Sequence, residues 1–254
     1  MRHSLITQLI PVAGNEDMLA NIPHKQIEDL ALVYRFSVGR DEHGQSTILV
    51  KNDMLDRYGI TAEQLHEDAM MSAPQIEAPS MKTLFETTAE IMGEDFFELM
   101  GEVEPAMPGI YVCTNESKHH GASVLMYPDF MDEVADKLGG DFYIIPSSIH
   151  ETLLFPTKDV ENYHDLEAMV REVNETQVAP EERLSDNVYH YDAEAKAFEL
   201  AQHHEERIAD MEKDSGDRGE KASVLKDLTA KSKEVAEKAP KEHAAPKKSR
   251  AEEA

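Results

Sequence analysis

The sequence has one cysteine, no tryptophan and few aromatic residues, which make up 6 % of its 254 positions. Because Cys113 has no second cysteine to pair with, an internal disulfide and a cysteine-built zinc site are both excluded. The absence of disulfides is typical of the reducing cytoplasm, so we expect a cytoplasmic protein.

Basic residues are also scarce, with 25 Lys and Arg against 51 Asp and Glu. Residues 1–200 carry 13 basic and 38 acidic residues, a net charge of −25, whereas residues 201–254 carry 12 and 13. Such a charge repels nucleic-acid phosphates, so direct binding of DNA or RNA is not expected. An acidic surface attracts basic partners and can imitate a phosphate backbone to a nucleic-acid-binding protein, although solubility alone also accounts for it.

Long apolar runs and the common cofactor motifs are missing as well. No stretch approaches the ~18–20 continuous apolar residues of a membrane span, and the N-terminus lacks a signal-peptide core. The chain contains no G-x-G-x-x-G, G-x-x-x-x-G-K-[ST], G-x-S-x-G or H-E-x-x-H pattern. We therefore expect no membrane association and no cofactor, and we favour a role other than catalysis.

Interleaved strand and helix patterns predict an α+β fold. Residues 31–38 and 46–51 predict a β-hairpin, and Thr61 with Gln64 predicts the capping box of a helix. We expect an antiparallel or mixed sheet built from hairpins, with helices packed on one side. The other expected helices cover residues 80–92, 128–140 and 159–176, with a short one between 179 and 187, and the other expected strands cover residues 109–115, 122–128, 142–145, 151–156 and 188–191.

Composition changes near residue 193. Residues 1–192 are expected to form the α+β globular domain. Helix formers with opposite charges at helical spacing predict a charged helical extension over residues 193–240. Residues 241–254 lack the apolar content that offsets the entropy of ordering, so we expect a disordered tail.

The segment DFYIIPSSIHETLLFP, residues 141–156, gathers a hydroxyl, an imidazole and a carboxylate between two apolar runs. Ser148, His150 and Glu151 are candidate catalytic residues, with Asn174 as a candidate orienting group from the following helix. The alternative is a turn, because Pro-Ser-Ser is ordinary turn chemistry and Ser148 with Glu151 matches a capping box. The glycine-flanked elbow that exposes a catalytic serine is absent.

Histidines number 12 and raise the question of a metal site. The adjacent pairs His119-His120 and His203-His204 are poorly placed for chelation, because neighbours point to opposite faces of a strand and lie about 100° apart on a helix. We therefore expect no metal.

The order of several segments resembles an uncharacterised bacterial domain-of-unknown-function family, numbered five-six-eight-eight. The resemblance covers roughly residues 5–195. It rests on MLANIPHKQIEDLALVYR, STILVKNDMLDRYGITAEQLHEDA, IYVCTNESKHHGASVLMYPDFMDEVADKLGGDFYIIPSSIHETLLFP and MVREVNETQVAPEERLSDNVYHYD.

The resemblance implies occurrence in anaerobic gut bacteria, often on integrated mobile elements, and supplies no catalytic residues to carry over. Members of that family are expected to have a further segment ahead of the point that matches Met1, which this sequence does not contain.

Three functions remain open. The favoured one is a non-enzymatic acidic accessory protein of a mobile element that binds a basic or nucleic-acid-handling protein. The second is a hydrolase-like enzyme that uses Ser148, His150 and Glu151, with Asn174. The third is an oligomeric scaffold that assembles through an uncovered edge strand. The oligomeric state is not predicted by the sequence.

Overall fold

The computed structural model describes residues 4–41, 44–93, 109–146, 148–211 and 213. The chain divides into two compact units, residues 1–204 and residues 205–254. In the second unit the described residues 205–211 are helical. Most of the expected helical extension and all of the expected tail, residues 241–254, lie outside the described residues.

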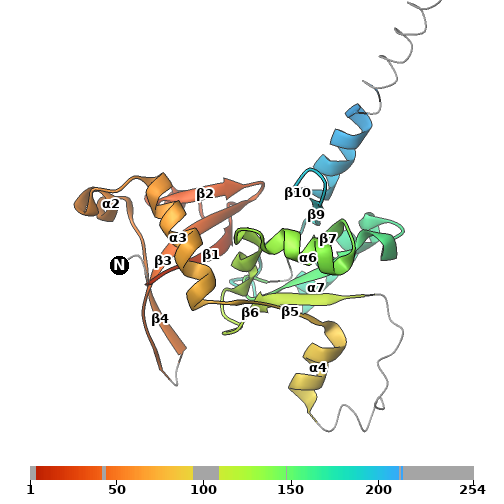
Figure 1. Cartoon of the computed structure of the whole chain (residues 1–254), viewed down its shortest axis with the longest axis horizontal. Coiled ribbons are helices and arrows are strands. Elements are labelled where there is room, and N and C mark those ends of the chain that lie inside the picture. Colours follow the sequence, from red (N-terminus) through yellow and green to blue (C-terminus); the bar gives the residue numbers. More distant parts are fainter. Residues whose placement is uncertain (1–3, 42–43, 94–108, 147, 212, 214–254) are drawn as a thin grey trace, which may run out of the picture. The chain divides into compact units, whose positions relative to one another are not determined.

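The first unit has the predicted α+β architecture, and its N-terminal part is an antiparallel four-stranded sheet (Figure 1). β3 pairs with β1 along one edge, and with β2 and then β4 along the other. The pairing of β3 with β4 confirms the predicted hairpin. The strands are β1 (Leu5–Pro11), β2 (His24–Ile27), β3 (Leu30–Asp41) and β4 (Gly44–Leu49).

A second sheet of six strands has the order β10-β9-β7-β8-β6-β5, and each neighbouring pair is antiparallel. The predicted strands on both sides of the PSSIHE segment are β7 and β8, which pair with each other. The strands are β5 (Pro79–Thr83), β6 (Tyr111–Asn115), β7 (Phe142–Ile145), β8 (Thr152–Pro156), β9 (Tyr189–Asp192) and β10 (Ala197–Leu200).

Capping residues set the helix boundaries. The predicted capping box of Thr61 and Gln64 begins α3, and Gly139, in the left-handed conformation, follows the end of α6. Both boundaries are set by residues next to the helix end: side chains that cap the backbone N–H groups in the first case, and a glycine, which has no Cβ, in the left-handed conformation in the second. The helices are α1 (Glu16–Leu19), α2 (Asn52–Tyr58), α3 (Ala62–Ile76), α4 (Leu84–Met92), α6 (Phe130–Leu138) and α7 (Tyr163–Thr176), with 3-10 turns η2 (Gly121–Met126) and η3 (Thr157–Asp159).

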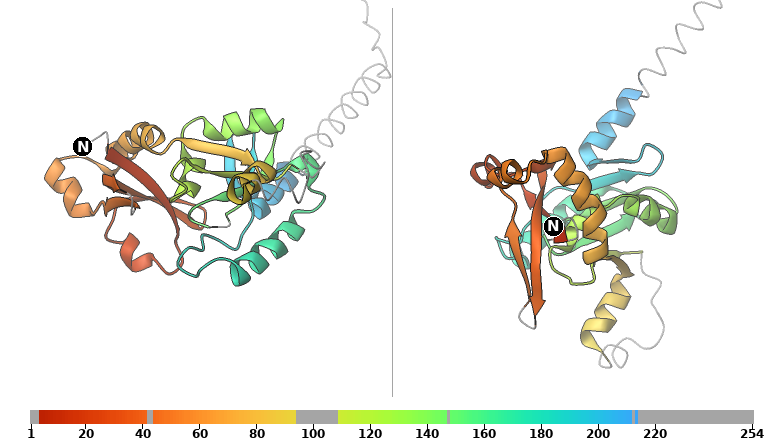
Figure 2. Two further views of the ribbon diagram at one scale, coloured as in Figure 1. Left: turned by 90° about the horizontal axis from the view of Figure 1, so that it is seen from below. Right: turned by 60° about the vertical axis from the view of Figure 1, so that its left-hand side comes forward.

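Helices cover both faces of the second sheet, whereas the sequence predicts them on one (Figure 2). Side chains along β7 alternate between two buried clusters, as the two-residue period of a strand requires. Phe142 and Ile144 pack in a cluster with Val134 of α6. Ile145 packs in another with Val170 of α7. The sheet is therefore buried on both sides.

Asp29, in the turn between β2 and β3, connects the two sheets. Its carboxylate accepts hydrogen bonds from the hydroxyl of Ser185 at 2.8 Å, from the side-chain amide of Asn187 at 3.0 Å and from the hydroxyl of Tyr189 in β9. Burial and the facing carboxylate of Asp29 raise the pKa of Tyr189, so this hydroxyl stays protonated and donates.

Three local predictions are wrong. Residues 80–83 belong to β5 instead of a helix, because β5 pairs with β6 and the capping box of Thr83 and Glu86 starts α4 at Leu84. The expected strand at residues 122–128 is mostly the 3-10 turn η2, whose buried residues fill the core. The short helix expected between residues 179 and 187 is a set of turns and bends.

The first unit extends past the expected domain end at residue 192. β10 pairs with β9, and the backbone N–H of Ala201 donates to the carbonyl of Val188 at 2.9 Å. The second sheet therefore ends with β10, and a helix begins at residue 201. No helix within the described part of the chain is long and apolar enough to cross a bilayer.

Candidate functional site

The PSSIHE segment connects β7 to β8 and is described apart from Ser147. The hydroxyl oxygen of Ser148 accepts the backbone N–H of His150 at 3.0 Å and that of Glu151 at 3.3 Å. The backbone N–H of Ser148 donates to the carbonyl of Glu151 at 3.3 Å. These contacts are those of a side chain that stabilises a tight turn.

The imidazole of His150 has polar contacts at both of its nitrogens. Nδ1 accepts a hydrogen bond from the backbone N–H of His120 at 3.2 Å. Nε2 therefore carries the hydrogen in the neutral ring, and it lies 3.5 Å from a carboxylate oxygen of Glu182. A ring held in this way is oriented by His120 and Glu182 and is not aimed at the hydroxyl of Ser148.

The other two candidates lie in different surroundings. Asn174 in α7 is 1 % exposed, and its amide donates to the carbonyl of Ser185 at 2.9 Å and to a carboxylate oxygen of Asp186 at 2.7 Å. Glu151 lines a hollow of about 370 Å³ beside β5, β6 and α4. The structure thus brings Ser148, His150 and Glu151 into one turn and places Asn174 where it anchors a separate loop.

Three histidines gather beside this turn. The ring centroids of His119, His120 and His150 lie 4.1 to 5.6 Å apart. Burial, followed by the neighbouring His119, His150 and Arg35, lowers the pKa of His120 to about 3. His120 is therefore neutral at physiological pH, and its Nδ1 is buried without a hydrogen-bond partner.

Gly121 allows this close approach. A Cβ added there would lie 2.1 Å from the hydroxyl oxygen of Thr114 and 2.5 Å from the carbonyl oxygen of His150. Real atoms do not approach so closely, so only glycine fits between β6 and the PSSIHE turn. The sequence places His120 in a turn, but the contact with His150 depends on the positions of separate strands.

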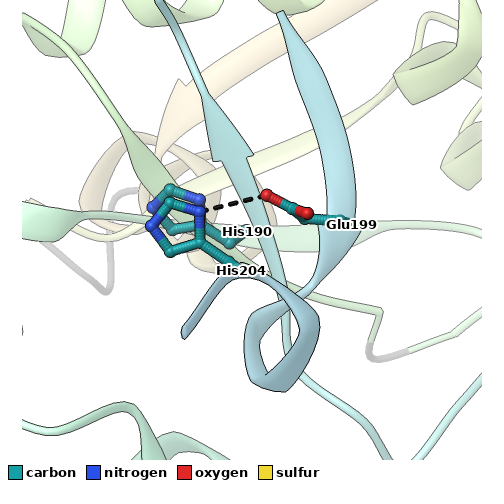
Figure 3. Close-up of side chains that lie close together, drawn as sticks. All are labelled: His190, Glu199 and His204. Carbon is teal, nitrogen blue, oxygen red and sulfur yellow. Dashed lines mark hydrogen bonds and ion pairs between the residues drawn. The ribbon is translucent and has the colours of Figure 1, made fainter. Parts of the chain in front are cut away.

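A second cluster was missed by the sequence analysis, and it joins His190, Glu199 and His204 (Figure 3). His190 in β9 and Glu199 in β10 are directly opposite each other in the pairing of the two strands. The ring of His204 stacks on that of His190 with centroids 3.7 Å apart, and its Nδ1 lies 3.0 Å from Glu199. The adjacent pair His203-His204 is split, because His203 contacts Glu28 instead.

The exposed side of α7 carries a group of carboxylates. Asp165, Glu172 and Glu175 fall within a sector of about 80° at 100° per residue, opposite the buried Leu166 and Val170. We call these three acidic residues the α7 acidic face. Its carboxylates project from one side of a regular helix.

The comparisons with known proteins give a family and no function. The family of unknown function DUF5688 matches residues 1–193, which agrees with the resemblance seen in the sequence. The match includes the PSSIHE turn, the three-histidine cluster, α7 and His190, whereas Glu199 and His204 lie beyond it. No curated protein and no solved structure matches the chain.

Proposed function

Since the chain belongs to the DUF5688 family, whose function is unknown, we propose from its own surface that it is an acidic interaction protein. It binds a basic protein, of the kind that handles nucleic acids, and the contact is made by the α7 acidic face. The observation that carries this proposal is the concentration of unneutralised carboxylates on and around one helix.

Residues 159–186 contain nine Asp and Glu against two Arg, a net charge of −7. Arg171 is 3.7 Å from Glu167, and Arg183 donates to the carbonyl of Val178. Within the described part of the chain, no ion pair involves Asp165, Glu172 or Glu175. The two arginines thus leave the negative charge of the α7 acidic face in place.

Several basic side chains elsewhere in the first unit are also engaged within the chain. Lys82 pairs with Glu90, Lys196 pairs with Asp132, and Lys158 donates to the carbonyl of Leu138 at 3.0 Å. Exposed pairs of this kind add little stability, but they neutralise the basic residues. The carboxylates of the α7 acidic face, held at fixed spacing on a helix, attract a complementary basic surface and accelerate association with it.

A mobile-element accessory factor is the biological setting we propose, because nucleic-acid-handling proteins carry the basic surfaces that such a face would bind. The hydrolase alternative is less favoured. Ser148 accepts two backbone hydrogens and the ring of His150 is directed to His120 and Glu182, so a nucleophile–base contact requires rearrangement of the turn.

The proposal is tested by affinity capture from the native host with the full chain as bait. Wild type is compared with the triple variant Asp165→Asn, Glu172→Gln, Glu175→Gln. The matched control, Glu16→Gln with Asp17→Asn and Asp56→Asn, removes the same charge at three other exposed positions.

We expect wild type and control to recover the same basic protein at low salt and to lose it as salt is raised, since screening weakens exposed charge contacts. The triple variant is expected to recover much less. Equal recovery by all three baits, or a partner that is insensitive to salt, contradicts the proposal. Light scattering of the bait alone shows whether the chain self-assembles, as the scaffold alternative requires.

A further inference from the structure

The strand pairing of β9 and β10 places a histidine beside a carboxylate. His190 and Glu199 are cross-strand partners, so their side chains project from the same face of the hairpin. His190 is 1 % exposed, and the side chain of Glu199 is 13 % exposed. An imidazole and a carboxylate are therefore held together on a rigid element, largely away from water.

His204 completes the group from the helix that begins at residue 201, directly after β10. The hydrogen bond from the N–H of Ala201 to the carbonyl of Val188 fixes the start of this helix against the residue that precedes β9. The side chain of His204 is 19 % exposed and lies over His190 (Figure 3). One ligand atom from each of the three residues lies within 4.8 Å of the others.

The orientation of His190 leaves one of its nitrogens without a partner. Nε2 faces a carboxylate oxygen of Asp141 at 3.9 Å, whereas Nδ1 is buried and has no hydrogen-bond partner. The other oxygen of Asp141 accepts the backbone N–H of Ala193 at 2.9 Å, which holds the carboxylate in place. At 3.9 Å the contact with Asp141 is longer than a hydrogen bond. A histidine with a carboxylate near one nitrogen and the other nitrogen open nevertheless has the outline of a metal-binding histidine, whose second nitrogen donates to such a group.

We propose that His190, Glu199 and His204 form a binding site for a divalent transition metal ion of the Zn²⁺ class. In this arrangement His190 binds through Nδ1, and Asp141 orients the ring. Two imidazoles and one carboxylate suit Zn²⁺ better than Mg²⁺ or Ca²⁺, which prefer oxygen ligands. A fourth position is left for water or for a group of a bound molecule.

Binding requires a small local change. Zinc–nitrogen distances of about 2.0–2.1 Å put tetrahedral ligands about 3.4 Å apart, so the three ligand atoms must draw together. Two stacked rings do not direct their lone pairs at one point, so His204, the more exposed of the two, tilts out of the stack.

The test uses the full chain, treated with a chelator and dialysed. Calorimetric titration with Zn²⁺ is expected to show one tight site per chain, and Co²⁺ is expected to give the visible absorption of a four-coordinate ion. Glu199→Gln and His204→Gln should each weaken binding by more than about 100-fold, and Asp141→Asn by about 10- to 100-fold, as changes behind a ligand do.

Two controls separate this site from the other histidines. His203→Gln removes the neighbouring imidazole that contacts Glu28, and His150→Gln removes one from the three-histidine cluster. Both are expected to bind as tightly as wild type. Circular dichroism checks that each variant is folded, and imidazole nitrogen spectra of wild type and of His204→Gln show whether histidines bind the ion.

Zinc-dependent shifts of two imidazoles in those spectra, absent from His204→Gln, support the site. Wild-type affinity in the Glu199→Gln and His204→Gln variants overturns it, as does a loss of binding in His150→Gln alone. A wild-type chain that binds neither ion also overturns it. The proposal is independent of the α7 acidic face.

Discussion

Gly121 lies against the carbonyl oxygen of His150, with room for a hydrogen but not for a carbon between them: a Cβ at this position would be 2.5 Å from that oxygen. The contact joins η2 to the PSSIHE turn, and the N–H of Ala122 adds a hydrogen bond to the carbonyl of Ile149 at 3.2 Å. The histidine cluster therefore depends on the absence of a side chain at one position.

We expect Gly121→Ala to lower the free energy of unfolding by about 1–3 kcal/mol or more, because backbone must move to relieve the overlap. Urea unfolding measures the change. Gly39→Ala is the matched control, since a Cβ at Gly39 meets nothing within 4 Å. Equal urea unfolding midpoints for Gly121→Ala and Gly39→Ala would contradict this expectation, because they would show that the PSSIHE turn accommodates the Cβ without losing stability.

Asp29→Ala is expected to destabilise the first unit by about 2–3 kcal/mol, because hydrogen bonds to a charged group are strong and the hydroxyl of Tyr189 would lose its acceptor. Tyr189 is 0 % exposed, so water cannot easily replace the carboxylate. Chemical denaturation followed by circular dichroism checks the value. Asp56→Ala, at an exposed position on α2, should change stability by less than about 0.5 kcal/mol.

His120 makes stability depend on pH. Its pKa in the folded chain is about 3, below the ordinary value of 6.5, so folding favours the neutral ring. The stability it contributes is fully present above pH 6.5 and is lost as pH falls from 6.5 toward 3, by at most about 1.4 kcal/mol per pH unit.

His120→Asn removes this titration and keeps the left-handed backbone, φ 55°, that asparagine tolerates. We expect a shallower fall in unfolding free energy between pH 6.5 and 5 than in wild type, measured by urea titration at each pH. His164→Asn, at an exposed position, is the control and should keep the wild-type slope. Identical slopes in all three proteins would contradict the role given to His120.

Asn174→Ala tests whether this residue anchors a loop or serves a catalytic site. Loss of the amide leaves the carbonyl of Ser185 without its donor, so we expect destabilisation by about 1–3 kcal/mol. Hydrogen exchange should show faster opening of residues 185–187 in particular. If the variant has wild-type stability and wild-type hydrogen exchange, Asn174 does not anchor the loop, and a catalytic role for it is favoured instead.

The sequence predicted the elements whose signals are local. The capping box of Thr61 and Gln64, the end of α6 at Gly139 and the β7–β8 pair all depend on residues close together in the chain, and all are confirmed. Residues 122–128 have the β-rich composition of a strand, but most of them form η2. They cannot pair with β6, because β5 occupies one edge of that strand and β8 occupies the other. Tertiary pairing decided this element, and composition alone does not reveal it.

The candidate sites likewise include one with a local sequence signal and one that depends on tertiary pairing. Ser148, His150 and Glu151 share a turn, as their adjacency in the sequence suggests, while the orientation of His150 depends on His120, 30 residues away. His190 and Glu199 have an obvious relationship only once the register of β9 and β10 is known. Histidines separated by 14 positions give no sequence signal, so a search for adjacent pairs misses this cluster.

The proposed function depends on contact between the α7 acidic face and a basic partner. Zero-length carbodiimide crosslinking tests it most directly, because it joins a lysine of the captured partner only to a carboxylate in contact with it. We predict crosslinks at Asp165, Glu172 and Glu175 that disappear as salt is raised. Crosslinks confined to Glu16, Asp17 and Asp56, or none on α7, would show that the partner does not bind the α7 acidic face.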